Sequence, residues 1–170
     1  MGARGQRAAG FPGNWVAAIA TLGPVGRRLP APGTWGSLAG LLYFRVFFSR
    51  LNWAENLGIS VVAGVVAACF CGLAERVLGK KDPGEVILDE FVAMPLCFLG
   101  WPMLVHRWPV WTVLLGGFVL FRFFDILKPL GISRLQRLKG GWGVVIDDTA
   151  AALAACATLH VLVRFFVVRG

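Results

Sequence analysis

The sequence has little charge and almost no histidine. Charged residues make up 15% of its 170 residues, against about 25% in ordinary soluble domains, and there are two histidines and one tyrosine. Hydrophobic residues reach 57% and the mean hydropathy is +0.70, which is more apolar surface than a soluble domain of this size can bury. The composition therefore predicts a membrane protein, and the length suits one domain covering residues 1–170.

Cysteine and histidine offer no recognisable site. The four cysteines lie in apolar runs and lack the spacing of a zinc site, so we expect small buried side chains. A Cys-x5-Arg phosphatase motif is missing, because only four residues separate Cys71 from Arg76. A DxDx[TV] motif is also absent, and the topology predicted below puts His106 and His160 far from the acidic motifs. A covalent phosphocysteine, phosphohistidine or phosphoaspartate route is therefore not expected.

The excess charge is positive. Seventeen Lys and Arg against nine Asp and Glu give a net charge of +8 and an isoelectric point of about 10.2. A basic balance often indicates a nucleic-acid partner. Here the basic residues lie in short loops between apolar runs, which instead favours membrane topology and anionic phospholipid headgroups. We expect a membrane and a phospholipid as partners and no nucleic acid; the sequence leaves the oligomeric state open.

Five apolar stretches are candidates for membrane-spanning helices, which need about 20 mostly apolar residues. They cover residues 35–51, 57–74, 91–105, 108–124 and 149–168. The first contains two arginines, and the third is short and contains two prolines, so we expect the third to be broken or tilted. The expected fold class is all-α: a polytopic helical membrane protein with four or five spans around a helical-bundle core.

Residues 1–20 precede these spans and are expected to form an interfacial or flexible segment. A cleaved signal peptide is the alternative. It is disfavoured because the apolar run 15–22 is near the lower length limit and Pro12 and Gly13 interrupt its approach.

Charge placement orients the spans. If residue 1 is cytoplasmic, the segments 1–34, 75–90 and 125–148 lie on the cytoplasmic side. They hold eleven of the seventeen basic residues, whereas the opposite side holds two, which is a strong positive-inside bias. Eight of the nine acidic residues lie in or at the edge of the same segments. The sequence therefore predicts that the charged residues able to carry out chemistry lie on the cytoplasmic face of the protein.

Four segments supply the polar groups of that face. They are APGTWGS at 31–37, DPGEVILDE at 82–90, FRFFDILKP at 121–129 and GGWGVVIDD at 140–148. In the first, free backbone N–H groups at the turn could receive a phosphate, or Thr34 and Ser37 could merely cap a helix. In the third, Arg122 and Asp125 share a helix face and could form an internal ion pair.

Carboxylates from three helix ends meet two cations on this face. Hard oxygen ligands without Cys or His favour Mg²⁺ or Mn²⁺ over zinc. Such an ion can polarise a phosphoryl oxygen and activate water. Arg and Lys side chains can hold the remaining phosphate oxygens. These groups predict a metal-dependent reaction on a phosphate ester.

The four segments resemble, in the same order, the motifs of the phosphatidylglycerophosphatase A family, a group of bacterial membrane phosphatases. The resemblance covers most of the chain from about residue 20 to about residue 155. It implies Mg²⁺-dependent hydrolysis of phosphatidylglycerophosphate to phosphatidylglycerol and phosphate. It also implies a multi-pass protein of the bacterial cytoplasmic (inner) membrane, with the active site facing the cytoplasm.

Site residues follow from the resemblance position by position. The family's acids fall on Asp82, Asp89, Glu90, Asp125, Asp147 and Asp148, its basic residues on Arg122 and Lys128, and its turn on Pro32, Gly33, Thr34, Gly36 and Ser37. The expected catalytic residues are Asp89, Glu90, Asp125, Asp147 and Asp148. The expected metal ligands are Asp89, Asp147 and Asp148. The expected phosphate-binding residues are Arg122, Lys128, Gly33, Thr34 and Ser37.

Four positions depart from the family pattern, at Ala93, Gly131, Gln136 and Ala152. They leave open a catalytically impaired relative that acts as a membrane interaction protein. A small transporter is the other alternative, but it would need charges through the depth of the membrane rather than at one face.

Overall fold

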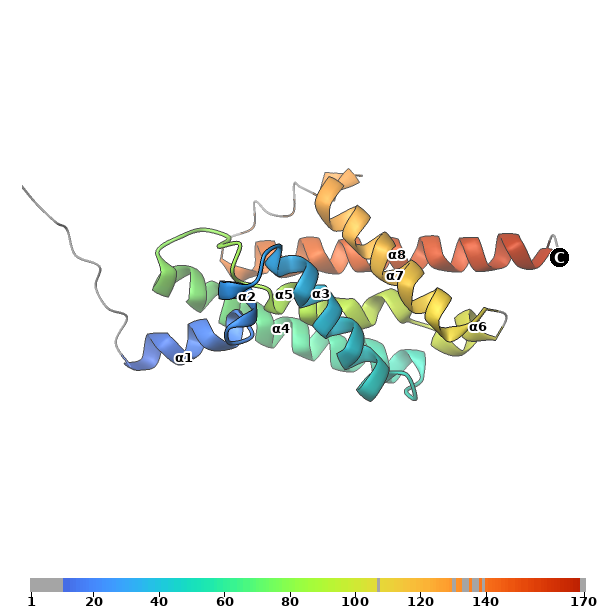
Figure 1. The fold of residues 1–170 in the computed structure, drawn as a ribbon, viewed down its shortest axis with the longest axis horizontal. Coiled ribbons are helices and arrows are strands. Elements are labelled where there is room, and N and C mark those ends of the chain that lie inside the picture. Colours follow the sequence, from blue (N-terminus) through green and yellow to red (C-terminus); the bar gives the residue numbers. More distant parts are fainter. Residues whose placement is uncertain are drawn as a thin grey trace, which may run out of the picture.

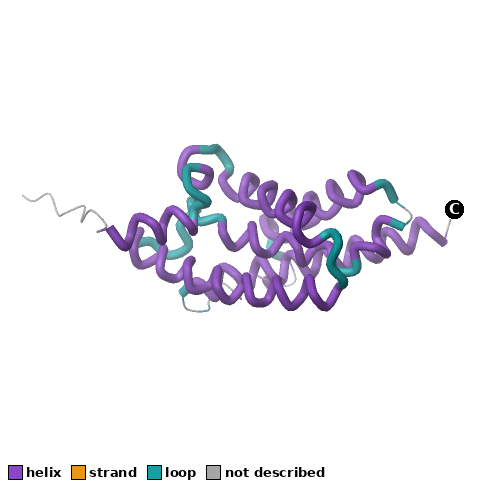
Figure 2. Tube along the Cα trace, turned by 90° about the horizontal axis from the view of Figure 1, so that it is seen from below, coloured by secondary structure: helices purple, strands orange, loops and turns teal. Residues whose placement is uncertain are grey.

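The computed structural model describes residues 11–106, 108–129, 131–132, 135, 138 and 140–168, and within them every regular element is a helix (Figures 1 and 2). The α-helices are α1 (Phe11–Ala20), α2 (Val25–Arg28), α3 (Pro32–Tyr43), α4 (Trp53–Leu78), α5 (Leu88–Ala93), α6 (Trp101–Val105), α7 (Val110–Leu127) and α8 (Gly141–Val168). A π-helical turn η1 (Phe44–Phe48) continues α3, and a 3₁₀ helix η2 (Met94–Phe98) follows α5. The all-α prediction is confirmed.

Three of the described helices are long and apolar enough to cross a membrane. They are Trp53–Leu78, Val110–Leu127 and Gly141–Phe165, which correspond to α4, α7 and most of α8. At 1.5 Å per residue α4 is about 39 Å long, enough for a hydrocarbon core of about 30 Å. The prediction of four or five spans is therefore not confirmed.

The two other expected spans are interrupted. In the stretch 35–51, α3 ends at Tyr43 and the chain continues in a π-helical turn. In the stretch 91–105, α5 gives way to η2 and then to α6, with Pro95 and Pro102 in the first turns of the last two. Proline lacks the N–H that a continuing helix needs and fits only its first turn, so this stretch is broken, as expected.

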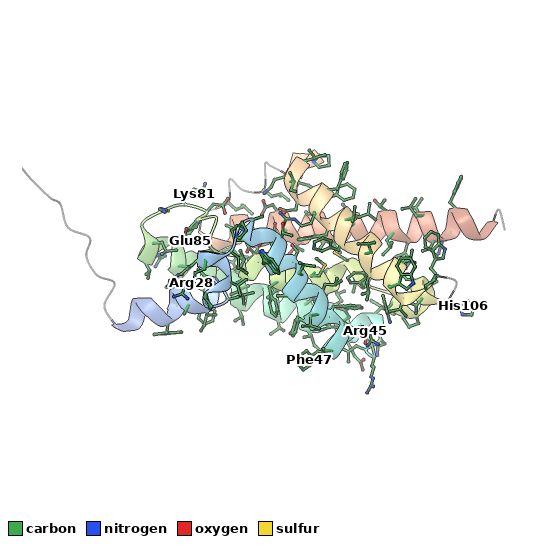
Figure 3. The ribbon with its side chains drawn as sticks, in the orientation of Figure 1. Arg28, Arg45, Phe47, Lys81, Glu85 and His106 are labelled. Atoms are coloured by element: carbon green, nitrogen blue, oxygen red, sulfur yellow. The ribbon has the colours of Figure 1, made fainter. Side chains whose placement is uncertain are left out.

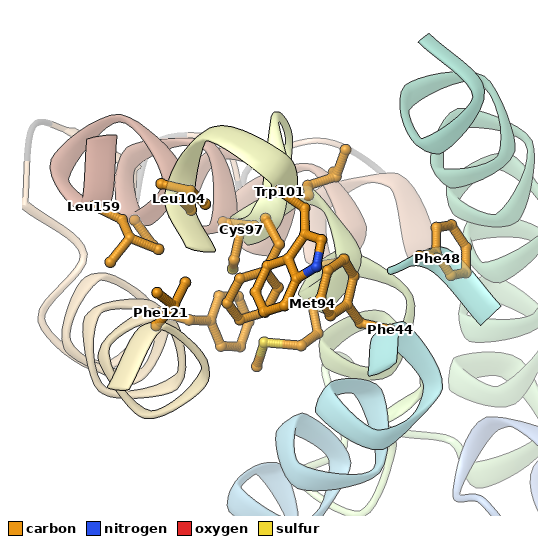
Figure 4. Packing of buried hydrophobic residues seen from close by; sticks show 14 of the residues in the cluster. Phe44, Phe48, Met94, Cys97, Trp101, Leu104, Phe121 and Leu159 are labelled. Atoms are coloured by element: carbon orange, nitrogen blue, oxygen red, sulfur yellow. The ribbon is translucent and has the colours of Figure 1, made fainter. Parts of the chain in front are cut away.

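The core joins these short elements to the long helices. Phe44 of η1 stacks on Phe98 of η2 with ring centroids 4.4 Å apart, and Trp101 packs edge to face against both rings (Figure 4). Phe121 of α7 and Leu159 of α8 complete the same buried cluster. The interrupted segment that carries α5 is therefore held between α3, α7 and α8.

Buried polar side chains satisfy main-chain carbonyls where the helices break. Asn56 Nδ2 donates to the carbonyl of Pro95 at 3.2 Å, and Ser60 Oγ donates to Asn56 Oδ1 at 3.1 Å. His160 Nε2 lies 2.7 Å from the carbonyl of Leu99. An unsatisfied carbonyl at membrane depth costs several kcal/mol, so these contacts fix the broken segment against α4 and α8.

Helices α4 and α8 run antiparallel along the long axis and touch through glycine (Figure 1). A Cβ on Gly72 would lie 3.0 Å from the nitrogen of Gly141, and a Cβ on Gly141 would lie 2.5 Å from the nitrogen of Gly72. Only hydrogen fits at either position. This close approach holds the first turns of α8, and hence Asp147 and Asp148, against the end of α4.

Helix α1 packs on α4. Val16, Ala17 and Ala20 are buried, while Trp15 and Ile19 stay exposed on the outer side. The interfacial location expected for residues 1–20 remains a prediction, and residues 1–10 lie outside the described part of the chain.

Candidate active site

The acidic motif residues come together at one end of the molecule. Asp89 and Glu90 lie in the first turn of α5, Asp125 lies near the end of α7, and Asp147 and Asp148 lie in the second turn of α8. The four aspartates are buried, with 1–9% of each residue exposed, and the Glu90 side chain is 14% exposed. Below, these five side chains are called the acidic cluster.

Charged side chains surround this end of the fold. Figure 3 shows Arg28, Lys81 and Glu85 near α2 and the loop before α5, whereas His106 lies at the opposite end. The position of His106 agrees with the expected separation between histidine and the acidic motifs.

The loop before α5 is pinned by α1 and α2. The N–H of Ile87 donates to the carbonyl of Ala20 at 3.0 Å. Gly26 lies so close to the carbonyl of Glu85 that a Cβ would overlap the oxygen. These contacts fix the direction in which the chain enters α5 and therefore the positions of Asp89 and Glu90.

Two glycines of the APGTWGS turn make room for Glu90. A Cβ on Gly33 would overlap Glu90 Oε1, and a Cβ on Gly36 would lie 2.8 Å from Glu90 Oε2. The first turn of α3 therefore lies directly against the Glu90 carboxylate. The N-cap residue of α3 is Ala31 and makes no side-chain cap bond, so the capping role considered for Thr34 and Ser37 is wrong.

Arg122 links three elements of the site. Its Nη1 donates to Asp125 Oδ2 at 2.7 Å, to Glu90 Oε1 at 3.3 Å and to Ser37 Oγ at 3.3 Å. The pair with Asp125 is the internal ion pair that the three-residue spacing indicated. The bonds to Glu90 and Ser37 join residues 32 and 85 positions apart in the chain.

Lys128 joins α7 to α8. Its Nζ donates to Asp147 Oδ2 in an ion pair. Lys128 has φ +44° at the C-cap of α7, a left-handed conformation that costs a non-glycine residue of order 1–2 kcal/mol. Ala31 and Asp82, beside the other motifs, are also left-handed, with φ +51° and +48°. Three of the four described non-glycine residues with positive φ therefore flank this site, and such strain gathers at functional sites.

Among the described residues, carboxylates outnumber cations in the acidic cluster. Its five carboxylates meet two described cations, Arg122 and Lys128, in a buried setting. Burial, with a smaller contribution from the charges of Asp82 and Asp147, raises the pKa of Asp89 to about 7, although two backbone N–H donors oppose the shift. Burial and the charge of Asp89 likewise raise the pKa of Glu90, against the opposing effect of Arg122.

Several polar atoms of the cluster are buried without a hydrogen-bond partner among the described residues. They are Asp89 Oδ1, Glu90 Oε2, Asp147 Oδ1, Asp148 Oδ2 and Arg122 Nε. Buried polar atoms are nearly always paired in folded proteins, so four orphaned carboxylate oxygens fit a missing cation. Among the described residues, however, no group of three or more Asp, Glu, His or Cys side chains is arranged so that it could hold a metal ion. The metal ligands Asp89, Asp147 and Asp148 stay a prediction.

Most of the residues expected in the site lie together. Asp89, Glu90, Asp125, Asp147 and Asp148 form the cluster, and Arg122, Lys128, Gly33 and Ser37 contact it. Thr34 lies in the first turn of α3, where its N–H donates to the carbonyl of Ala31 at 2.9 Å.

Three of the four departures from the family pattern fall on described residues. Ala93 and Ala152 are core residues. Gly131 has φ +80°, which proline cannot adopt, so the chain turns differently here from a family member with proline. Gln136 is outside the described residues.

Comparison with known proteins decides the family. The profile of the phosphatidylglycerophosphatase A family matches residues 18–163, a range that includes all four motifs. The chain belongs to the phosphatidylglycerophosphatase A family. It is therefore a phosphoric monoester hydrolase of phospholipid metabolism, and its apolar helices fit a membrane protein.

Three relatives each match about three quarters of this chain. The phosphatidylglycerophosphatase A of Haemophilus influenzae is 38% identical over 74% of this chain and 75% of its own length. That of Escherichia coli is 30% identical over 76% of this chain and 72% of its own length. A putative phosphatidylinositol-3-phosphatase of Bacteroides thetaiotaomicron is 38% identical over 72% of this chain and 77% of its own length. No solved structure matches the chain.

Proposed function

We propose that this phosphatidylglycerophosphatase A family member removes the terminal phosphate monoester of phosphatidylglycerophosphate in a Mg²⁺-dependent reaction. The products are phosphatidylglycerol and inorganic phosphate. The observation that carries this proposal is the acidic cluster, in which four buried carboxylate oxygens, from two motifs of a lipid phosphatase family, lack partners among the described residues.

Asp89, Asp147 and Asp148 are the proposed metal ligands, with Mn²⁺ as a possible substitute for Mg²⁺. Each has an orphaned buried oxygen. Proteins often hold Mg²⁺ through one or two carboxylates together with water and substrate phosphate, so a complete cage of protein ligands is not required. The chemistry that bound Mg²⁺ supplies is polarisation of a phosphoryl oxygen and activation of water.

Arg122 and Lys128 are proposed to offset the negative charge of the substrate phosphate. Arg122 uses Nη1 for Glu90, Asp125 and Ser37, while its Nε is buried without a partner among the described residues. An arginine fork held in this way can offer its remaining N–H groups to a phosphate oxygen. Glu90 and Asp125 keep the guanidinium in place, and Gly33 and Gly36 leave the space that Glu90 fills.

The substrate is proposed to enter from the cytoplasmic side of the bacterial inner membrane. The cluster lies where α4 and α7 end and α8 begins, at the end that carries Lys81 and Arg28 (Figure 3). Positive charge at one end of apolar helices favours the cytoplasmic side. At that depth a phospholipid places its headgroup at the site while its acyl chains stay in hydrocarbon.

A substrate panel tests this assignment. We expect purified protein to release phosphate fastest from phosphatidylglycerophosphate, then from phosphatidic acid, and slowest from soluble glycerol phosphate. Phosphatidylinositol 3-phosphate belongs in the panel because one relative carries that putative activity. Equal turnover of soluble glycerol phosphate and the lipid would overturn the lipid-specific assignment. A preference for phosphatidylinositol 3-phosphate would overturn the assignment of phosphatidylglycerophosphate as the substrate.

A further inference from the structure

A narrow apolar groove of about 260 Å³ lies between α4 and α8. Leu57, Val61 and Val65 line it at one residue per helical turn of α4, and Ile146 and Leu153 face them from α8. Both helices are candidate spans, so the groove opens at the depth of lipid hydrocarbon. Small-molecule pockets usually measure about 300–1,000 Å³, so this groove suits one extended chain better than a compact ligand.

Two further cavities continue from the groove toward the acidic cluster. Trp142 lines both the groove and a second cavity of about 470 Å³, which also contacts Arg76 and Gly140. Gly140 in turn lines a third cavity of about 200 Å³, together with Lys81 and Asp82. The charge of Asp82 acts on Asp89 and Asp147 of the cluster. Through the shared lining residues Trp142 and Gly140, the three cavities follow one another around the first turn of α8, and this series is called the path below.

We propose that the α4–α8 groove holds one acyl chain of the lipid substrate and that Arg76, in the adjoining second cavity, binds the phosphodiester of the same molecule. This inference rests on the proposed function, because it assumes a phosphatidylglycerophosphate-like substrate. Such a lipid carries a phosphodiester between its acyl chains and its terminal phosphate, as phosphatidylinositol 3-phosphate also does, whereas phosphatidic acid has none.

The positive charge of Arg76 along this path complements the anionic phosphodiester of the proposed lipid. Arg76 is exposed in the last turn of α4 and forms no ion pair with any described residue. Its guanidinium can bind two phosphate oxygens at once. A cation above an apolar groove complements an anionic group above an acyl chain, and the terminal phosphate then extends past Gly140 toward the cluster.

Chain-length dependence tests the groove. Gly64 lines it, and a Cβ there would meet only Val145 Cγ1 at 3.7 Å, so G64L should fill the groove with little disturbance of the backbone. We expect G64L to lower kcat/KM for dioleoyl phosphatidylglycerophosphate at least tenfold and to leave that for the dibutyryl analogue within twofold. The matched control is G58L on the same helix, where a Cβ meets nothing within 4 Å, and it should leave both values within twofold.

Each outcome of this comparison decides a different claim. Equal losses of G64L on both substrates, or no loss on either, would overturn the groove assignment. Failure of the wild type to hydrolyse either substrate would instead overturn the proposed function. If G64L does not fold, the wild type is labelled with phosphatidylglycerophosphate that carries a diazirine at mid-chain. Cross-links at Val61, Val65 or Leu153 support the groove, and cross-links confined to other lipid-facing residues, such as Leu115 and Val119 of α7, overturn it.

The role of Arg76 has its own test. R76A should lower kcat/KM for phosphatidylglycerophosphate about tenfold and change that for phosphatidic acid, which has no phosphodiester, by less than twofold. Lys80 is a matched basic control, because it is exposed nearby and lines none of the three cavities. An equal loss on both lipids in R76A, or no loss, would overturn the phosphodiester assignment.

Discussion

Replacing Gly33 with alanine should reduce activity much more than stability. The new Cβ would overlap Glu90 Oε1 and lie 3.2 Å from Arg122 Nη1. Because Glu90 is flexible at its carboxylate end, the carboxylate should move and the backbone should not. The move breaks the 3.3 Å bond between Glu90 and Arg122, whose side chains are 14% and 18% exposed.

The expected contributions of this substitution to the free energy of unfolding nearly cancel. Losing a charge-assisted hydrogen bond costs about 1.5–3 kcal/mol when buried, and partial exposure brings this toward 1 kcal/mol. Alanine is favoured over glycine within a helix by roughly 0.5–1 kcal/mol, which offsets most of that loss. Displacement of a positioned group by about 1 Å can cost about 100-fold in rate, so we expect kcat/KM to fall about 10-fold to 100-fold.

Two measurements on the same preparation check this prediction. Phosphate release from phosphatidylglycerophosphate gives kcat/KM, and thermal unfolding in detergent gives stability. Gly58→Ala on α4 is the control, because its Cβ meets nothing within 4 Å, and it should match the wild type in rate. Wild-type kcat/KM in Gly33→Ala would refute the claim that the Glu90–Arg122 contact positions the site.

Three further predictions follow from the acidic cluster and its location. Asp148→Asn should lower turnover at least 100-fold yet raise the melting temperature in EDTA, since it removes a buried charge; near-normal turnover would place the ligands elsewhere. In EDTA the melting temperature should be higher at pH 6 than at pH 8, because the raised pKa of Asp89, about 7, favours the protonated carboxyl in the folded state and this stabilisation is lost as pH rises through 7. A melting temperature that rises over this range would contradict the burial argument. In a cysteine-free background, a cysteine at Lys81 should resist impermeant reagents in intact cells while one at His106 reacts, since these residues lie at opposite ends (Figure 3); the reverse would invert the topology.

Local patterns in the sequence were enough to predict the long helices and one contact in the candidate site. The apolar stretches 57–74, 108–124 and 149–168 correspond to α4, α7 and α8. The length and apolar character of a membrane-spanning helix are properties of one continuous segment, so composition alone is enough to predict such a helix. The Arg122–Asp125 pair is likewise local, because residues three apart share a helix face.

Contacts between distant segments could not be predicted in the same way. Ser37 meets Arg122 across 85 positions, and Lys128 meets Asp147 across 19, and neither pairing follows from helical periodicity. The sequence also gave no sign that Gly33 and Gly36 would lie against Glu90, since a glycine at a turn has several uses. The predicted number of spans is not confirmed for a related reason: hydropathy does not reveal where η1 and η2 interrupt a helix.

Metal dependence of phosphate release tests the central claim most directly. Purified protein treated with EDTA should lose turnover of phosphatidylglycerophosphate and regain it when Mg²⁺ is added, whereas Asp147→Asn should stay inactive at any Mg²⁺ concentration. Full turnover in EDTA would contradict the account, because the orphaned oxygens of Asp89, Asp147 and Asp148 would then hold no ion that the reaction needs.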